Sequence, residues 1–242
     1  MMIRPLINID RKSSAYISDY LAKCSDLLTE YFFKSNPSVV LWSLQGLENR
    51  IIAAVDDLRK IIYIQADNPK IIDLFMQNFA KVNPLNSYRI DIPENLISYL
   101  NYHNIPKDFV EVYSILQYTE DLAPGTGRPV GTTKIIRNSK GIPMEAIICQ
   151  NNQTLACSSV FWLSDNAAEI SIECLNCQQG ADFLINVLSA HSYELNKIGI
   201  IPIYLVSETN FHSRRLAEKV GFVDTGKRLI EINGFSNWRT IC

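Results

Sequence analysis

The sequence predicts an α/β (α+β) protein whose sheet is mixed, mainly antiparallel and flanked by helices. Two observations support this fold class. The apolar run 203–206 precedes a helical apolar stripe within 210–220, which is the pattern of a buried strand joined to an amphipathic helix. Two other apolar runs, 146–150 and 155–162, flank the turn-forming segment 151–153 and predict an antiparallel hairpin.

The composition is typical of a folded globular chain. With 242 residues, of which 47% are hydrophobic, the chain is long enough for one large domain or two small ones. A formal net charge of −2 and scattered Lys and Arg residues argue against a nucleic-acid-binding surface. No run reaches the roughly 18 to 20 apolar residues that span a bilayer, and residues 1–12 lack the apolar core of a signal peptide. We therefore expect a cytoplasmic protein without a membrane span.

The first half of the chain, residues 1–122, alternates helical and extended patterns in the order helix, strands, helix, strand, helix, strand. The expected elements are a helix at 14–33, an antiparallel meander of 39–44, 51–55 and 61–64, helices beginning near Pro69 and after Pro93, and a strand at 110–116. The Pro/Gly-rich segment 123–131 is the expected linker. It does not read as a phosphate-binding loop, because the Gly-Lys-[Ser/Thr] ending is missing and Pro129 removes an amide.

The second half, residues 132–242, has the clearer pattern. After the hairpin we expect a strand at 169–175 and a helix at 181–196, then the strand and helix described above, and a last strand at 228–232. The second helix has clear boundary signals. Asn210 can accept a backbone N–H at its start, and Gly221 can adopt a positive φ just past its end.

These residues carry a resemblance to a known family. The spaced pattern N-x-x-[SA]-x-x-L-x-x-K-x-G-F occurs here as Asn210, Ser213, Leu216, Lys219, Gly221 and Phe222. It resembles the closing half of the GNAT superfamily of acyl-CoA-dependent N-acyltransferases, and the resemblance covers about residues 132–235. The first half is similar only in layout, so the resemblance implies a GNAT fold of two related halves, with a degenerate one at the amino terminus, as in glycine N-acyltransferase-like families.

The resemblance implies a reaction and its substrates. An acyl group, acetyl or longer, would pass from acyl-CoA to a primary amine of a small molecule or peptide, such as an amino acid, a lysine or ornithine side chain, or an amine natural product. No metal is implied. The acyl-CoA acts as a co-substrate. The acceptor, the acyl length and the oligomeric state are not readable from the residues. The alternative is a GNAT-fold binding protein that has lost its affinity for acyl-CoA and has no catalytic role.

In the family, a loop with the pattern Q/R-x-x-G-x-G/A at the start of the third helix binds the CoA diphosphate through backbone amides. The corresponding residues here are Gln179, Gly180, Ala181, Asp182, Phe183 and Leu184. Asp182 stands where the first glycine belongs, and its charge opposes that of a phosphate. Three interpretations stay open: Gly180 supplies the flexibility after a shift of two residues, Asp182 caps the helix while the diphosphate binds differently, or CoA binding is weakened or lost.

The same resemblance implies roles for the end of the fourth strand. The pantetheine arm would pair with the backbone of Cys174, Leu175 and Asn176, and would be contacted by Asn210 and Ser213. Glu173 is the candidate general base, because a partly desolvated carboxylate near the end of this strand could accept a proton from an amine. For Asn210, capping of its own helix is the competing explanation, and for Glu173 it is a solvated surface position.

The usual general acid of the family, a tyrosine, is replaced here by Ala217, so that either the thiolate leaves without that acid, or another hydroxyl or His212 serves in its place. For His212, an exposed surface position is the competing explanation. His191 falls in the middle of a helix and is expected to be structural. The six cysteines include a single C-x-x-C pair, Cys174 and Cys177. No histidine lies close to that pair in the sequence, which argues against a zinc site.

Overall fold

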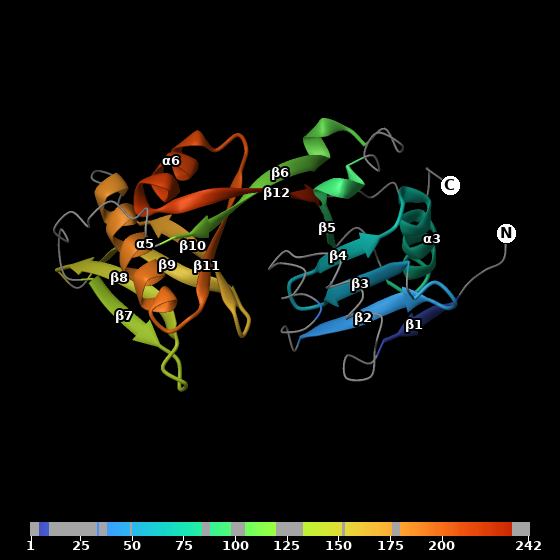
Figure 1. Cartoon of the computed structure of the whole chain (residues 1–242), viewed down its shortest axis with the longest axis horizontal. Coiled ribbons are helices and arrows are strands. Elements are labelled where there is room, and N and C mark those ends of the chain that lie inside the picture. Colours follow the sequence, from blue (N-terminus) through green and yellow to red (C-terminus); the bar gives the residue numbers. More distant parts are fainter. Residues whose placement is uncertain are drawn as a thin grey trace. The chain divides into compact units, whose positions relative to one another are not determined.

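The computed structural model describes residues 5–9, 33, 38–48, 50–83, 88–97, 105–119, 133–151, 153–175 and 180–233. The chain divides into two compact units, of which unit 1 comprises Met1–Tyr113 and Arg228–Cys242 and unit 2 comprises Ser114–Lys227. Two long strands, β6 (Val110–Tyr118) and β12 (Phe222–Ile232), contribute residues to both units. Figure 1 labels the elements of both units. The expected linker, 123–131, lies outside the described residues.

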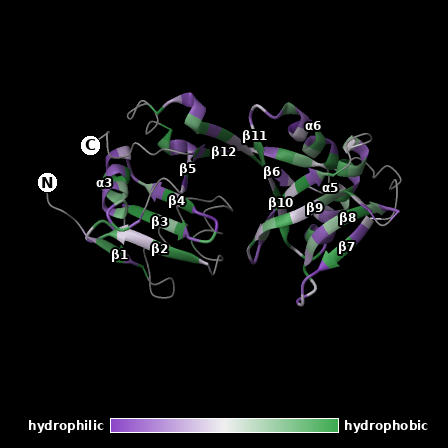
Figure 2. Cartoon of the chain, turned by 180° about the vertical axis from the view of Figure 1, so that it is seen from behind, coloured by the Kyte–Doolittle hydropathy of each residue, from purple (hydrophilic) through white to green (hydrophobic). Residues whose placement is uncertain are grey.

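Unit 1 is built on a mixed sheet with the strand order β1-β2-β3-β4-β5-β12. The strands are β1 (Leu6–Asn8), β2 (Val39–Leu44), β3 (Ile51–Asp56), β4 (Ile61–Ala66) and β5 (Arg89–Pro93). The expected meander is confirmed, because β2, β3 and β4 pair in antiparallel fashion. Every residue of β3 and β4 is buried, and both strands are largely hydrophobic in Figure 2. Strand β5 pairs with β4 in parallel after the crossover helix α3 (Pro69–Phe79).

Helix α3 begins as the sequence predicts. Pro69 occupies the first turn, where its missing N–H costs nothing, and the Asn68 side chain accepts a hydrogen bond from the backbone N of Ile71. After Pro93, where we expected a helix to begin, the chain forms the short 3-10 helix Glu94–Leu96, and residues 98–104 lie outside the described residues. A second 3-10 helix, Lys107–Phe109, leads into β6. The helix expected at 14–33 lies outside the described residues, apart from Phe33.

Unit 2 carries the strand order β6-β11-β10-β9-β8-β7. Its strands are β7 (Thr133–Arg137), β8 (Pro143–Gln150), β9 (Gln153–Leu163), β10 (Ala167–Cys174) and β11 (Ile201–Ser207), and its helices are α5 (Gly180–Asn196) and α6 (Phe211–Val220). Strands β7 to β10 are antiparallel, whereas β10 and β11 are parallel and are joined by α5. Helices α5 and α6 contact each other, and Figure 1 shows both against the sheet of this unit.

The predicted elements of unit 2 are confirmed, with shifted ends. The hairpin β8–β9 turns at Asn151, whose φ of 51° is a left-handed conformation that asparagine tolerates. Strand β12 begins at Phe222 and not near 228, because the helix stops at Gly221, with a φ of 105°, and the chain becomes extended at once. Strand β7 was not predicted, since its five residues, Thr-Lys-Ile-Ile-Arg, do not alternate in hydropathy.

Candidate functional site

The two parallel strands of unit 2 pair over only part of their length. The register of β10 and β11 runs from Ala167 opposite Ile201 to Glu169 opposite Ile203. All residues of both strands are described, and beyond Glu169 and Ile203 the two strands no longer pair with each other. On its other side β10 stays paired with β9 as far as Cys174, after a register shift between Glu169 and Ile170. The pairing of β10 with β11 therefore ends well before the carboxyl ends of the two strands, and we call this feature the β10/β11 divergence.

Helix α5 begins close to the end of β10. A Cβ atom built on Gly180 would lie 2.9 Å from the Sγ atom of Cys174, so a glycine at this position lets the thiol pack against the helix start. Ala181 and Asp182 follow in the first turn, and both are exposed. The first backbone amides of a helix have no partner within the helix. Unit 2 thus presents a helix amino terminus beside the carboxyl end of β10. Asn176 and Gln179 lie outside the described residues.

Asp182 lies inside the helix, in its first turn, rather than at the cap. A carboxylate there is favoured by the helix dipole without needing a ligand. Phe183 and Leu184 are half-buried and pack against the cluster that includes Ala156 and Val187. Their side chains contribute to the core of unit 2.

Glu173 lies on the face of β10 opposite Ile170 and Ile172, as the alternation predicts. Ile170 and Ile172 pack in the core cluster beneath the helices, so Glu173 is directed to the other face and is exposed. The partial burial that we expected for this carboxylate is therefore not found in the described structure. Its cross-strand neighbour is Cys157, whose pKa is raised by burial and by the carboxylates of Glu145 and Glu173.

Leu175 extends the line of β10. Its backbone N donates to the carbonyl oxygen of Leu155 at 2.8 Å, on the β9 side, and its side chain is 53% exposed. Leu175 therefore exposes apolar surface just after the carboxyl end of β10.

Helix α6 starts at the carboxyl end of β11. The Oδ1 atom of Asn210 accepts a hydrogen bond from the backbone N of Ser213 at 3.1 Å, which confirms Asn210 as the helix cap. Capping uses the oxygen of this amide and leaves the Nδ2 group as a donor toward a ligand. Because β10 and β11 are parallel, their carboxyl ends lie at the same edge of the sheet. Glu173, near the end of β10, and Asn210, just after β11, both belong to that edge.

The sequence did not indicate Tyr204 as a site residue. It is the first residue of β11 after the last paired position, it is 6% exposed, and its ring packs against Phe222 with the ring centroids 5.9 Å apart. Burial raises the pKa of Tyr204. The only signal in the sequence was one aromatic hydroxyl among the aliphatic residues of this strand. Ala217 is fully buried in the same core cluster as Tyr204.

The two described histidines have different surroundings. His191 is fully buried in α5 and contacts Ser158 and Pro143, in agreement with the structural role that we expected. His212 is exposed in the first turn of α6. Only His212 is therefore accessible at the end of the parallel strands.

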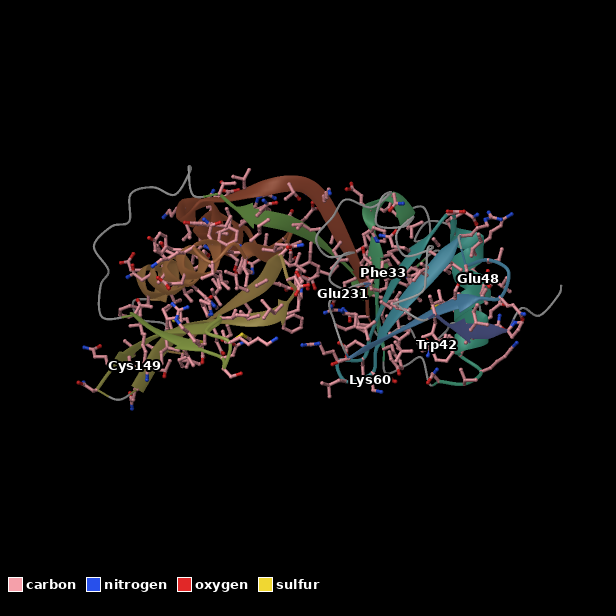
Figure 3. All side chains as sticks on the ribbon, turned by 60° about the horizontal axis from the view of Figure 1, so that its bottom comes forward. Phe33, Trp42, Glu48, Lys60, Cys149 and Glu231 are labelled. Atoms are coloured by element: carbon pink, nitrogen blue, oxygen red, sulfur yellow. The ribbon has the colours of Figure 1, made fainter. Side chains whose placement is uncertain are left out.

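The described residues contain no group of three or more His, Cys, Asp or Glu side chains that could hold a metal ion. None of the described helices is both long and apolar enough to cross a bilayer. Cys149 is an exposed thiol near the end of β8 (Figure 3). Cys177, the partner of Cys174 in the C-x-x-C pair, lies outside the described residues.

Several solved structures are similar to this one. A GCN5-related N-acetyltransferase from Sphaerobacter thermophilus aligns with a TM-score of 0.61 at 12% identity, over 93% of this chain and 94% of that one. A GNAT-family acetyltransferase from Colwellia psychrerythraea aligns with a TM-score of 0.51 at 15% identity, over 94% and 98%. A GCN5-related N-acetyltransferase from Kribbella flavida aligns with a TM-score of 0.54 at 10% identity, over 78% and 91%. The chain has the GNAT fold.

The predicted fold class, with its mixed and mainly antiparallel sheet, is thereby confirmed. The resemblance described above equates β10 and β11 with the fourth and fifth strands of the GNAT pattern, and α5 and α6 with its third and fourth helices. No protein-family model and no curated protein matches the sequence.

Proposed function

We propose that this protein is an N-acyltransferase that moves an acetyl or longer acyl group from acyl-CoA to a primary amine of a small molecule or peptide. The observation that carries the proposal is the β10/β11 divergence, where two parallel strands stop pairing after Glu169 and Ile203. An extended ligand arm can add to a strand edge through backbone hydrogen bonds. Similar structures described as acetyltransferases support the same reaction class.

Three groups of this chain would hold acyl-CoA. The edges of β10 and β11 would pair with the amides of the pantetheine arm, which requires no particular side chain. The first amides of α5, at Gly180 and Ala181, would bind the diphosphate, because a helix amino terminus favours negative charge. The Nδ2 group of Asn210 would donate to a carbonyl oxygen of the arm, since Oδ1 already caps α6.

Glu173 would act as the base. An ammonium group must lose a proton before its nitrogen can attack the thioester carbonyl carbon. The C–N bond then forms, the C–S bond breaks, and the sulfur leaves with the electron pair as a thiolate. Glu173 is an exposed carboxylate near the carboxyl end of β10, where an incoming amine could reach it directly or through water.

Calorimetry with CoA and acetyl-CoA tests binding, and release of free thiol in the presence of a panel of primary amines tests transfer. Glu173→Gln should lower kcat by about a hundredfold at neutral pH and leave CoA affinity nearly unchanged. Glu145→Gln is the matched control. Like Glu173, Glu145 is a carboxylate that raises the pKa of Cys157, but it belongs to β8. Equal losses in both variants, or wild-type turnover of Glu173→Gln, would refute the assignment of the base.

One specific observation favours a second candidate function. Asp182 places an exposed negative charge in the first turn of α5, where a diphosphate would bind. A protein of this fold without affinity for CoA would serve as a binding module and not as an enzyme. Absence of CoA binding by calorimetry, together with a folded protein, would support this second function and reject the first.

We also propose that residues 1–122 and 132–242 are two related GNAT-like halves. Each unit contains three successive antiparallel strands, then a helix, then a strand parallel to the third. In unit 1 this is β2–β3–β4, α3 and β5, and in unit 2 it is β8–β9–β10, α5 and β11.

A further inference from the structure

Unit 1 also contains a parallel strand pair that is joined by a helix, and a buried carboxylate stands where the pairing stops. The register of β4 and β5 ends at Tyr63 opposite Asp91, although both strands, which are described throughout, continue for some residues. On its other side Asp91 lies opposite Glu231 of β12. Tyr63, Asp91 and Glu231 are therefore neighbours in register on three adjacent strands.

These three side chains share one face of the sheet. Ile90 and Ile92, on either side of Asp91 in β5, belong to the core cluster that includes the buried residues of α3. Because side chains alternate along a strand, Asp91 lies on the face opposite to α3. The residues that flank Tyr63 and Glu231 in their strands belong to the same core cluster, so these two side chains lie on that face as well. Asp91 is fully buried, Tyr63 is 1% exposed and Glu231 is 7% exposed.

One arginine joins the two carboxylates. The Nη2 atom of Arg89 lies 2.8 Å from Oδ2 of Asp91, and its Nη1 atom lies 2.9 Å from Oε2 of Glu231. Oε1 of Glu231 accepts a hydrogen bond from the side-chain amide of Asn233. The remaining oxygen, Oδ1 of Asp91, is also buried, but no donor among the described residues reaches it. A buried acceptor without a donor is costly, so this oxygen points to a ligand that supplies one.

The surroundings of this oxygen are negatively charged. A third carboxylate, Glu111 of β6, accepts a hydrogen bond from the Tyr113 hydroxyl at 2.9 Å. Burial raises the pKa of Tyr113 above its ordinary range, and the charges of Glu231 and Glu111 raise it further, so this phenol stays neutral. Arg89 then faces more than one carboxylate, and the cluster has an excess of negative charge when the acids are ionised.

Aromatic surface adjoins the buried carboxylate. Tyr63, which pairs in register with Asp91, packs edge-to-face against Phe33 with the ring centroids 5.8 Å apart. Phe33 is fully buried. Aromatic rings attract both cations and apolar groups. The side of the cluster formed by β4 is therefore suited to a cation that carries an apolar substituent.

We propose that unit 1 binds a small primary ammonium ion with an apolar substituent, which donates a hydrogen bond to Oδ1 of Asp91 and lies against Tyr63 and Phe33. The ammonium group supplies both the missing donor and positive charge. Every residue of this site belongs to unit 1, so the inference goes beyond the proposed acyl transfer and does not depend on it.

A metal ion is not the favoured occupant, because the described residues contain no group of His, Cys, Asp or Glu side chains arranged to hold one. The main competitor is a proton, since burial raises the pKa of Asp91 to about 6. The groups that face this carboxyl are Arg89 of its own strand, Glu231 of β12 and Tyr63 of β4. A carboxyl that only binds a proton has no affinity for an ammonium ion, which distinguishes the two explanations.

Calorimetry of the full chain at pH 7.5 tests the proposal, with 2-phenylethylamine as the probe and 2-phenylethanol as its neutral counterpart. We expect the amine to bind, and the alcohol to bind at least about tenfold more weakly. Asp91→Asn should weaken amine binding by roughly tenfold or more, and Glu231→Gln by several-fold. Asp67→Asn should bind the amine as the wild type does. It is the matched control, because Asp67 also belongs to unit 1 and pairs with an arginine but is exposed.

The pH dependence gives a second readout. Lowering the pH from 7.5 to 5 should weaken amine binding by about tenfold, because the proton then competes for Asp91 while the amine stays cationic. Asp91→Asn should not show this dependence. If Asp91→Asn fails to fold, Glu231→Gln and the pH profile of the wild type decide the question.

Equal binding of amine and alcohol, or no binding of either, would overturn the proposal. So would amine binding that is lost in Glu173→Gln and kept in Asp91→Asn and Glu231→Gln, because the amine would then lie in unit 2. Absence of CoA binding would reject the proposed function and leave this inference standing.

Discussion

The Nδ1 atom of His191 lies 2.9 Å from the Oγ atom of Ser158, and both side chains are fully buried. The other ring nitrogen, Nε2, lies 3.3 Å from the carbonyl oxygen of Pro143. A carbonyl can only accept, so Nε2 carries the hydrogen and Nδ1 accepts from the Ser158 hydroxyl. The neutral imidazole therefore ties α5 to β8 and β9 inside unit 2.

This arrangement predicts that unit 2 is sensitive to acid. Burial lowers the pKa of His191 to about 4, from 6.5 in the unfolded chain. Because the unfolded state takes up the proton first, the contribution of neutral His191 is complete above pH 6.5 and is lost as the pH falls toward 4. The shift corresponds to about 3 kcal/mol in the free energy of unfolding.

Urea unfolding between pH 4.5 and 7.5 measures this effect. The difference in unfolding free energy between wild type and His191→Gln should shrink steadily as the pH falls. Ser158→Ala is a useful control, since it should cost about 1 to 3 kcal/mol by leaving Nδ1 without its donor, yet keep the titrating ring. Parallel pH curves for wild type and His191→Gln would show that the imidazole is not held neutral.

The burial of Asp91 in unit 1 predicts the opposite pH dependence of the unfolding free energy. It is fully buried on β5, opposite Glu231 of β12, and its Oδ2 atom lies 2.8 Å from a guanidinium nitrogen of Arg89. Burial raises its pKa from 3.8 to about 6, against the attraction of Arg89. The folded state therefore takes up the proton first, and the stability contributed by Asp91 falls as the pH rises from about 4 through 6.

The Asp91→Asn variant should remove this slope. At each pH the unfolding free energy of the variant is subtracted from that of wild type. This difference should decrease as the pH rises from 4 to 6, whereas the corresponding difference for His191→Gln should increase. Asp67→Asn is the control, because Asp67 also pairs with an arginine, Arg50, but both side chains are over 40% exposed. Equal pH slopes for wild type and Asp91→Asn would exclude a buried titrating carboxyl at this position.

Removing the charge of Asp182 should tighten CoA binding. Asp182 is exposed in the first turn of α5, so Asp182→Asn removes a negative charge from the proposed diphosphate site without altering the core. The expected gain is about 1 kcal/mol, or several-fold in Kd, at low salt, and it should shrink as salt rises. Asp165→Asn, in an exposed turn before β10, should leave Kd unchanged. Weaker binding by Asp182→Asn would make this carboxylate a ligand contact.

Calorimetry should find one CoA site per chain, although both units contain a helix after their third antiparallel strand. In unit 1 the start of α3 is closed, because Pro69 has no N–H and the amide of Ile71 already bonds to Asn68. Asn68→Ala should cost about 1 kcal/mol of stability and leave the binding stoichiometry at one. Two equivalents of CoA per wild-type chain would contradict the assignment of the site to unit 2.

Boundaries set by local chemistry could be read from the sequence. Asn210 caps α6 and Gly221 ends it because a side-chain amide and a positive φ act within one helical turn. Pro69 could likewise be placed at the start of α3, because its missing N–H is tolerated in the first helical turn. Strand β7, by contrast, escaped detection because β8 is its single pairing partner among the described strands, and its place is decided by that partner rather than by its own pattern.

The sequence by itself determined which segments form the parallel pair, the helices after them, and the alternation that puts Glu173 and Ile170 on opposite faces. Only the tertiary structure decided that Glu173 is exposed, that Tyr204 packs against Phe222, and that His191 contacts Ser158. The periodicities of strands and helices arise within a few residues, so a short stretch of sequence is enough to recognise them. Exposure and side-chain pairing depend on which distant segments pack together, and local patterns do not carry that information.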